Sequence, residues 1–157
     1  MFTQSVEYAL RTVVCLAYGG DLPQTTVQIA KKTLVPKAYL SKVIQLLTRA
    51  DILISRRGIG GGVSLKIHPE KLKILDIVNA IEPIQRIKTC PLGLKAHGVL
   101  LCPLHKRMDE ALEMVERAFA ASSLAEILAE PNSSYPLCEI KPDSPVPSFQ
   151  EKISLKS

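Results

Sequence analysis

The chain of 157 residues has no tryptophan, and aromatic residues make up only 4% of it. Stacking of single-stranded bases on aromatic side chains is therefore not the expected mode of binding. The sequence also has no run of 18 apolar residues, so we expect no membrane-spanning helix. Met1 is followed by a helix-prone stretch with Glu7 and Arg11, not by the basic and apolar segments of a signal peptide. These absences predict a cytoplasmic protein.

The common motifs of enzymes are missing as well. Four glycines lie within residues 58–62, but no Lys-Ser or Lys-Thr pair follows them, as a nucleotide-binding loop would require. No paired carboxylates and no Ser/His/Asp arrangement accompany the cysteines and histidines. A metalloenzyme is therefore disfavoured, and we expect the protein not to be an enzyme.

The chain does have a modest excess of positive charge, with a net charge of +5 and a sequence pI near 9.1. This excess favours a polyanionic partner without identifying it. The length is sufficient for one domain with its own core and an extension. The four cysteines, in a reducing compartment, indicate metal or redox chemistry more than structural disulfides.

Residues 26–65 have the pattern of a winged helix-turn-helix, which predicts a mainly α fold with a small β-hairpin wing. A first short helix would bury Val27, Ile29 and Ala30 and end at residues 34–36. Two β-prone runs around residues 58–62 suit a tight hairpin. Between them, a second helix is predicted to have an apolar face formed by Tyr39, Leu40, Val43, Ile44, Leu46 and Leu47.

The second helix and the hairpin carry the candidate DNA contacts. Exposed donors near the start of such a helix reach base edges and phosphates in the major groove. Arginines beside glycines suit a wing that contacts phosphates or enters the minor groove. Alternatively, the hairpin has no function and its arginines belong to a solvated turn. The predicted DNA-binding residues are Lys37, Ala38, Tyr39, Ser41, Lys42, Arg56, Arg57 and Gly58.

Helical periodicity also describes the regions on either side. We predict a first helix from Thr3 to Tyr18, with Cys15 as a small buried residue. After the hairpin, a short helix would be closed by Pro83. A helix over residues 103–128, longer than the core requires, is predicted by an apolar stripe of Leu104, Met108, Leu112, Val115 and Phe119. The proline-containing tail that follows holds the isolated thiol Cys138.

Two cysteines and two histidines lie within sixteen residues, at Cys90, His97, Cys102 and His105. Thiolate and imidazole ligands suit zinc or iron–sulfur chemistry. Two cysteines and two histidines would form a closed tetrahedral zinc site. Alternatively, the cysteines are ordinary thiols or form a disulfide on oxidation.

These motifs extend over three stretches, SVEYALRTVVCLAY, AYLSKVIQLLTRADILISRRGIGGGVSLKI and ILDIVNAIE, followed by a cysteine-bearing segment. Together they resemble the Rrf-type family of bacterial transcription regulators, which includes IscR, NsrR and CymR. The RG-x-GGG segment is the most specific part. The resemblance implies a homodimer that binds a palindromic operator of double-stranded DNA, with binding controlled by an iron–sulfur cluster.

The resemblance also implies a ligand set. Cluster-binding members have three evenly spaced cysteines; Cys90 and Cys102 match the outer two, but Ala96 stands at the middle position. His105 matches a histidine ligand of IscR, so the implied set is these two cysteines and His105. Ala96 keeps open a metal-free regulator controlled by a thiol switch or a protein partner.

The set would be completed by His97 or by Glu7 of the other subunit, because Glu7 matches the position of an acidic ligand in some members. Mixed ligation favours a two-iron over a four-iron cluster, with zinc as the alternative metal. The resulting organisation is a DNA-binding domain (1–83), a cluster-binding loop (84–102), a dimerisation helix (103–129) and a flexible tail (130–157).

Overall fold

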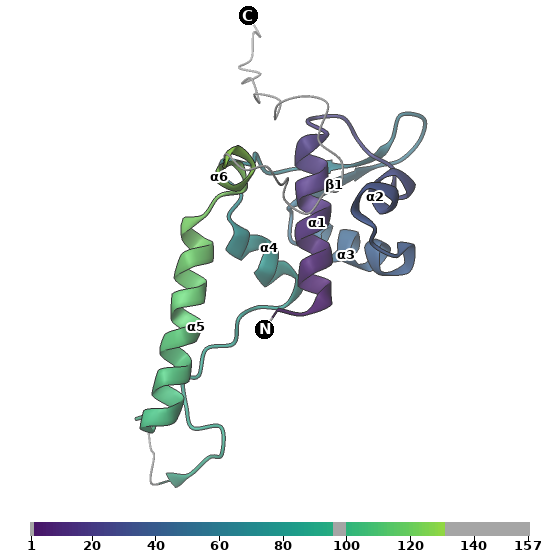
Figure 1. The fold of residues 1–157 in the computed structure, drawn as a ribbon. Coiled ribbons are helices and arrows are strands. Elements are labelled where there is room, and N and C mark those ends of the chain that lie inside the picture. Colours follow the sequence, from purple (N-terminus) through teal and green to yellow (C-terminus); the bar gives the residue numbers. More distant parts are fainter. Residues whose placement is uncertain (1, 96–99, 131–157) are drawn as a thin grey trace, which may run out of the picture.

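The computed structural model describes residues 2–95 and 100–130 (Figure 1). Over these residues the chain forms six helices and one antiparallel hairpin, which confirms the predicted mainly α fold with a small wing. None of the helices in this part of the chain is both long and apolar enough to cross a lipid bilayer. The elements are α1 (Gln4–Tyr18), α2 (Thr26–Thr33), α3 (Lys37–Arg49), β1 (Leu53–Arg56), β2 (Gly62–Leu65), α4 (Ile74–Ile81), α5 (Pro103–Ala121) and α6 (Leu124–Ala129).

Helix α1 lies at the centre of the core and contacts α2, α3, α4 and β2 (Figure 1). Its apolar residues recur at helical spacing, and Cys15 is buried with them, 3% exposed. Side chains that recur every three or four residues share one helix face, which explains why the pattern predicted this core. The largest fully buried side chains are Leu16, Ile29, Leu40, Leu47, Ile52, Leu53, Leu72, Ile77 and Leu124.

The helix-turn-helix is set by local signals at both ends of α2. Thr25 and Gln28 form a capping box at its start. Its last turn is closed by Leu34 in the left-handed conformation, φ 58°, and Pro36 is the N-cap residue of α3. Ile29 is buried as predicted, but Val27 is 58% exposed, which corrects the prediction. Two helical turns present only a narrow stripe to the core.

The apolar face of α3 is also narrower than predicted. Leu40, Val43 and Leu47 are buried, and their spacing of three and four residues defines the face toward the core. Tyr39, by contrast, is 56% exposed, with its ring packed on Tyr8 at a centroid distance of 5.9 Å.

The hairpin pairs β1 with β2 from Leu53↔Leu65 to Arg56↔Gly62. β2 is fixed near the turn of the hairpin, because the backbone of Gln24 exchanges two hydrogen bonds with Val63, at 2.9 and 2.8 Å. Gly62, at φ +150°, lies against that backbone, and a Cβ there would be 2.7 Å from the Gln24 carbonyl oxygen. Glycine at this position therefore lets the hairpin approach the core.

The expected single helix over residues 103–128 is divided in two, which corrects the prediction. α5 ends at Ala121 and α6 begins at Leu124. Ser123 caps the second helix: Glu126 N donates to its hydroxyl at 3.2 Å, and Ser123 N donates to the Glu126 carboxylate at 2.6 Å. This capping box is the local signal for a new helix start.

The break also returns the chain to the segment before α4. Ile74 N donates to the Ser122 carbonyl at 3.1 Å, and the Lys73 ammonium donates to the Ala121 carbonyl at 3.0 Å. Because the last carbonyls of α5 are bonded to this segment, the helix stops there. α6 then packs on the segment before α4, where Leu124 N donates to the Leu72 carbonyl at 2.8 Å, and Leu124 is fully buried.

Helix α5 is much less covered than the core helices. None of its 19 residues is buried. Leu104 is 64% exposed, Met108 48% and Met114 62%, whereas Phe119 packs on the Phe2 ring at a centroid distance of 5.1 Å. Two of the five residues of the predicted apolar stripe, Leu104 and Met108, are therefore open to solvent in a single chain.

Candidate DNA-binding surface and cysteine–histidine site

Helix α3 presents its polar side chains to solvent. Lys37, Ala38, Tyr39, Ser41 and Lys42 are all exposed, and the first turns of the helix carry all five. The buried stripe on the opposite side fixes the orientation of this surface. The predicted residues therefore share one accessible surface at the start of the second helix.

One of these residues is partly engaged already. The Ser41 hydroxyl donates to the Lys37 carbonyl within α3 at 3.1 Å. Its lone pairs remain available as acceptors, but donation to a base would require the hydroxyl to rotate. Lys42 is therefore the better candidate for a direct donor contact.

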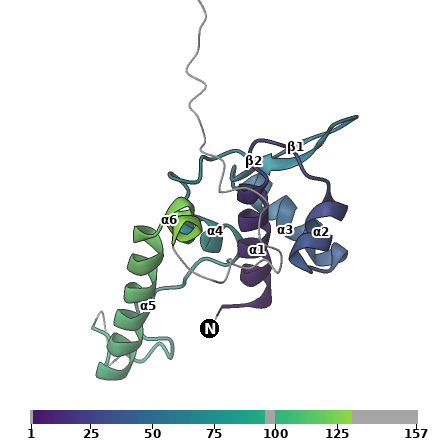
Figure 2. The same ribbon diagram turned by 45° about the horizontal axis from the view of Figure 1, so that its top comes forward.

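The hairpin projects from the helices (Figure 2). Arg56, Arg57 and Gly58 are exposed, and Ile59 at the tip is fully exposed. Gly58 has φ +95°, which a side chain would strain, so glycine shapes the turn after the two arginines. The structure thus places two guanidinium groups on a narrow projection close in sequence to α3.

Cys102 and His105 come together at the start of α5. Cys102 is its N-cap residue, and its Sγ lies 3.3 Å from Nδ1 of His105 one turn later. A tetrahedral metal with a sulfur ligand at ~2.3 Å and a nitrogen ligand at ~2.0 Å places those two atoms about 3.5 Å apart. The pair therefore has the chemistry and the separation of two ligands of one metal. Both residues are half-buried.

The rest of the predicted ligand set is not gathered around this pair. Within residues 2–95 and 100–130, no three His, Cys, Asp or Glu side chains are grouped so that they could hold a metal ion. Cys90 is buried, at 9% exposed. His97 and Ala96 lie outside the described residues, as does Cys138.

Glu7 lies on α1 and is paired within its own chain. Its carboxylate accepts from Arg11 at 3.0 Å, and Arg11 also donates to the carbonyl of Thr33, the last residue of α2, at 3.3 Å. Figure 1 shows α1 in the core, apart from the first turn of α5. A ligand role for Glu7 therefore requires a second copy of the chain.

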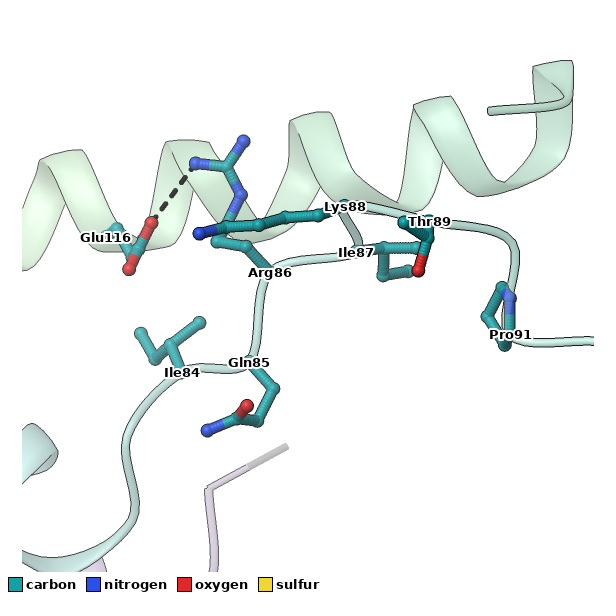
Figure 3. A pocket seen from close by; sticks show the side chains of 8 residues that line it. All are labelled: Ile84, Gln85, Arg86, Ile87, Lys88, Thr89, Pro91 and Glu116. Atoms are coloured by element: carbon teal, nitrogen blue, oxygen red, sulfur yellow. Dashed lines mark hydrogen bonds and ion pairs between the residues drawn. The ribbon is translucent and has the colours of Figure 1, made fainter. Parts of the chain in front are cut away.

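Sequence reasoning missed an ion-pair cluster beside the cysteines. Residues 84–91, which we call the arm, run along α5 toward its first turn (Figures 1 and 3). Arg86 points from the arm to α5 and holds Asp109 with two bonds of 2.7 Å, and Glu113 and Glu116 at 3.2 Å each. Ile87 N also donates to Asp109, at 2.8 Å. The only sequence signal was the spacing of the three carboxylates along one helix face.

This cluster fixes the charge state of Asp109. The hydrogen bond from Arg86 lowers the pKa of Asp109 to about 2; burial opposes the shift, and the Ile87 N–H adds to it. The Arg86 side chain is 26% exposed and that of Asp109 is 19% exposed. Between the arm and α5 is a cleft of about 590 Å³, lined on one side by Glu116 (Figure 3). The arm is thus attached to α5 by charge, next to an open space.

An exposed helix of a helix-turn-helix, with a projecting basic hairpin, defines the class of winged-helix DNA-binding proteins. Residues 2–130 match the Rrf2 family, described as iron-dependent transcriptional regulators, and the chain belongs to this family. It is 30% identical to the transcriptional regulator NsrR of Geobacillus kaustophilus over 134 residues, which cover 82% of this chain and 89% of that protein. The family consists of transcription regulators, not enzymes.

Solved structures have the same fold. CymR, the global cysteine regulator of B. subtilis, superposes with a TM-score of 0.69 and 20% identity, covering 84% of this chain and 98% of that one. IscR of T. potens gives 0.67 and 20%, covering 85% and 93%. The winged-helix fold predicted from the sequence is therefore confirmed.

Proposed function

We propose that this transcription regulator is a cytoplasmic homodimer that binds a palindromic operator, with affinity controlled by an iron–sulfur cluster. The Cys102–His105 pair carries the proposal, because its atoms have the separation of two ligands of one metal. Cys90 would supply a second thiolate, and the set would be completed by His97 or by Glu7 of a second chain. Mixed ligation favours a two-iron cluster over a four-iron one.

The proposed DNA contacts are Lys37, Ala38, Tyr39, Ser41 and Lys42 in the major groove. Arg56, Arg57 and Gly58 would contact phosphates or the minor groove; their exposure supports this role. Pairing through α5 would cover its open apolar stripe and set two α3 helices about 34 Å apart, one turn of DNA. An inverted repeat matches that symmetry.

Control would operate through α5, because the candidate ligands lie at its start and the core lies at its other end. The cluster, when bound, supplies a redox-active group whose loss frees its ligands. With the cluster bound, Cys102 and His105 would hold the first turn of α5. On its loss, α5 could change its tilt, and α6 would transmit that change to the segment before α4.

The test is to purify the protein without oxygen and measure iron, acid-labile sulfide and zinc per chain, together with the visible spectrum. We expect iron and sulfide with visible absorption, both lost in Cys90→Ala and Cys102→Ala. One zinc per chain without sulfide would contradict the cluster and make the site a structural clamp. A metal-free protein would instead favour the thiol-controlled or partner-controlled regulator.

A further inference from the structure

The arm and α5 run in opposite directions, and one ion-pair cluster fixes the register between them. Arg86 and Ile87 both bond to Asp109, so these residues lie opposite each other. Beyond this point the arm continues along α5 through Thr89 to Pro91 (Figure 3), and Cys102 is the residue before the first turn of α5. The positions of Cys90 and Cys102 along α5 can therefore both be counted from this ion-pair cluster.

The two paths have a similar maximum length. From Ile87 to Cys90 is three residues, which span at most about 10 Å, and the backbone bends at Thr89 within this stretch. From Asp109 back to Cys102 is seven residues, also about 10 Å at 1.5 Å per helical residue. A shift of the arm by one residue would move Cys90 by about 3.3 Å, more than a metal–sulfur bond. The register at Asp109 thus decides whether Cys90 lies level with the Cys102–His105 pair.

We propose that Arg86 is a positioning residue that, through Asp109, sets the register of the arm on α5 and so determines how closely Cys90 can approach Cys102 and His105. Three features of the chain favour this role. Arg86 binds Asp109 through two parallel bonds, a geometry that fixes orientation as well as distance. The same guanidinium reaches Glu113 and Glu116, so it spans two turns of α5. Residues 83–90 contain no helix or strand that would fix the register instead.

The inference rests on the proposed function, but it is testable in the metal-free protein. The full chain would be equilibrated anaerobically with reduced and oxidised glutathione. As the Cys90–Cys102 disulfide forms, oxidised glutathione takes up the two hydrogens and becomes two molecules of reduced glutathione. Peptide mass spectrometry would give the effective concentration of one thiol for the other. We expect Arg86→Ala and Asp109→Asn to lower this effective concentration at least tenfold. Arg86→Lys keeps the charge but loses the paired bonds, so its value should lie between those of the wild type and Arg86→Ala.

Arg117→Ala is the matched control, because Arg117 pairs with Glu113 on the same helix but is 72% exposed and does not hold the arm. It should leave the effective concentration unchanged, and unchanged far-UV circular dichroism would show that each variant is folded. Equal values for wild type and Arg86→Ala, at whatever level, would overturn the positioning role.

A Co²⁺ titration gives a second readout, through the absorption of thiolate-bound cobalt. Arg86→Ala should weaken this binding about tenfold or more, and Arg117→Ala should not. The same affinity in all three proteins would overturn the positioning role. Lack of iron and sulfide in the anaerobic wild-type protein would contradict the cluster alone, because neither the thiol equilibrium nor the cobalt titration depends on it.

Discussion

The DNA-reading half, which is α1 to α4 with the hairpin and α6, and the proposed sensing half, which is the arm with α5, are held together by different forces. The first half has a continuous apolar core, in which Leu40 and Leu47 are fully buried. In the second, α5 has no buried residue, and the arm is attached through Arg86. Apolar burial is strong and non-directional, whereas ion pairs at half-exposed positions contribute little to stability but define geometry. We infer that the reading half is stable on its own, whereas the sensing half is built to be repositioned.

The largest expected effect is on the free energy of unfolding, for which we compare one substitution in each half. Leu47→Ala should lower the free energy of unfolding by about 2–5 kcal/mol, because it leaves a cavity in the core. Met114→Ala on α5 should change it by no more than about 0.5 kcal/mol in dilute protein, because Met114 is 62% exposed. Urea unfolding of both variants gives the comparison. An effect of Met114→Ala that grows with protein concentration would show that a second copy covers α5.

A smaller effect is expected at the reading surface, where stability should not change but DNA binding should. Lys42→Ala should cost about 1–3 kcal/mol on the operator and less on altered operators, if Lys42 reads a base. Arg56→Ala with Arg57→Ala should weaken binding on every sequence and reduce the log-log salt slope by about 1 per lost phosphate contact. Binding titrations at several salt concentrations measure both. An unchanged slope would remove the hairpin from the interface.

The smallest effect concerns pH and the arm. Because Arg86 lowers the pKa of Asp109 to about 2, below the usual value near 3.9, the folded state binds fewer protons than the unfolded one in this range. The contribution of Asp109 to stability is therefore complete above pH ~4 and is lost as the pH falls toward 2. Carbon-detected NMR of the Asp109 carboxyl should show this midpoint, and Arg86→Ala should raise it. A midpoint near 4 in the wild type would mean that the arm is not attached.

The reading half was predictable because its signals are local and periodic. Ile29 and Leu40 follow from helical spacing, and the glycines of the hairpin follow from turn geometry. Val27 and Tyr39 were misassigned because short helices expose residues that lie just outside the buried stripe. The break before Ser123 was visible as a capping box, but the long apolar stripe concealed it.

The sensing half was less predictable, because its contacts join residues far apart in the sequence. Nothing near Arg86 indicates that its partners lie on a helix more than twenty residues later, since ion pairs leave no periodic pattern. The pairing of Cys102 with His105 was within reach, because residues three apart on a helix are neighbours. The remaining ligands stay predictions, because Cys90 is not grouped with this pair and the rest would have to come from His97 or a second chain.

The return of the chain at Ser122 has a consequence for how such regulators diversify. Residues 82–123 connect α4 to α6, and they form one closed excursion that is anchored at both ends, where Ile84 and Phe119 pack against the core. The entropy of closing such an excursion grows with the logarithm of its length, about 0.6 kcal/mol for each doubling. Lengthening, shortening or replacing the excursion therefore changes the free energy of the core very little. In polymer terms the proposed sensor is an interchangeable cassette, so that one DNA-reading half could acquire a new signal without a change in its own core.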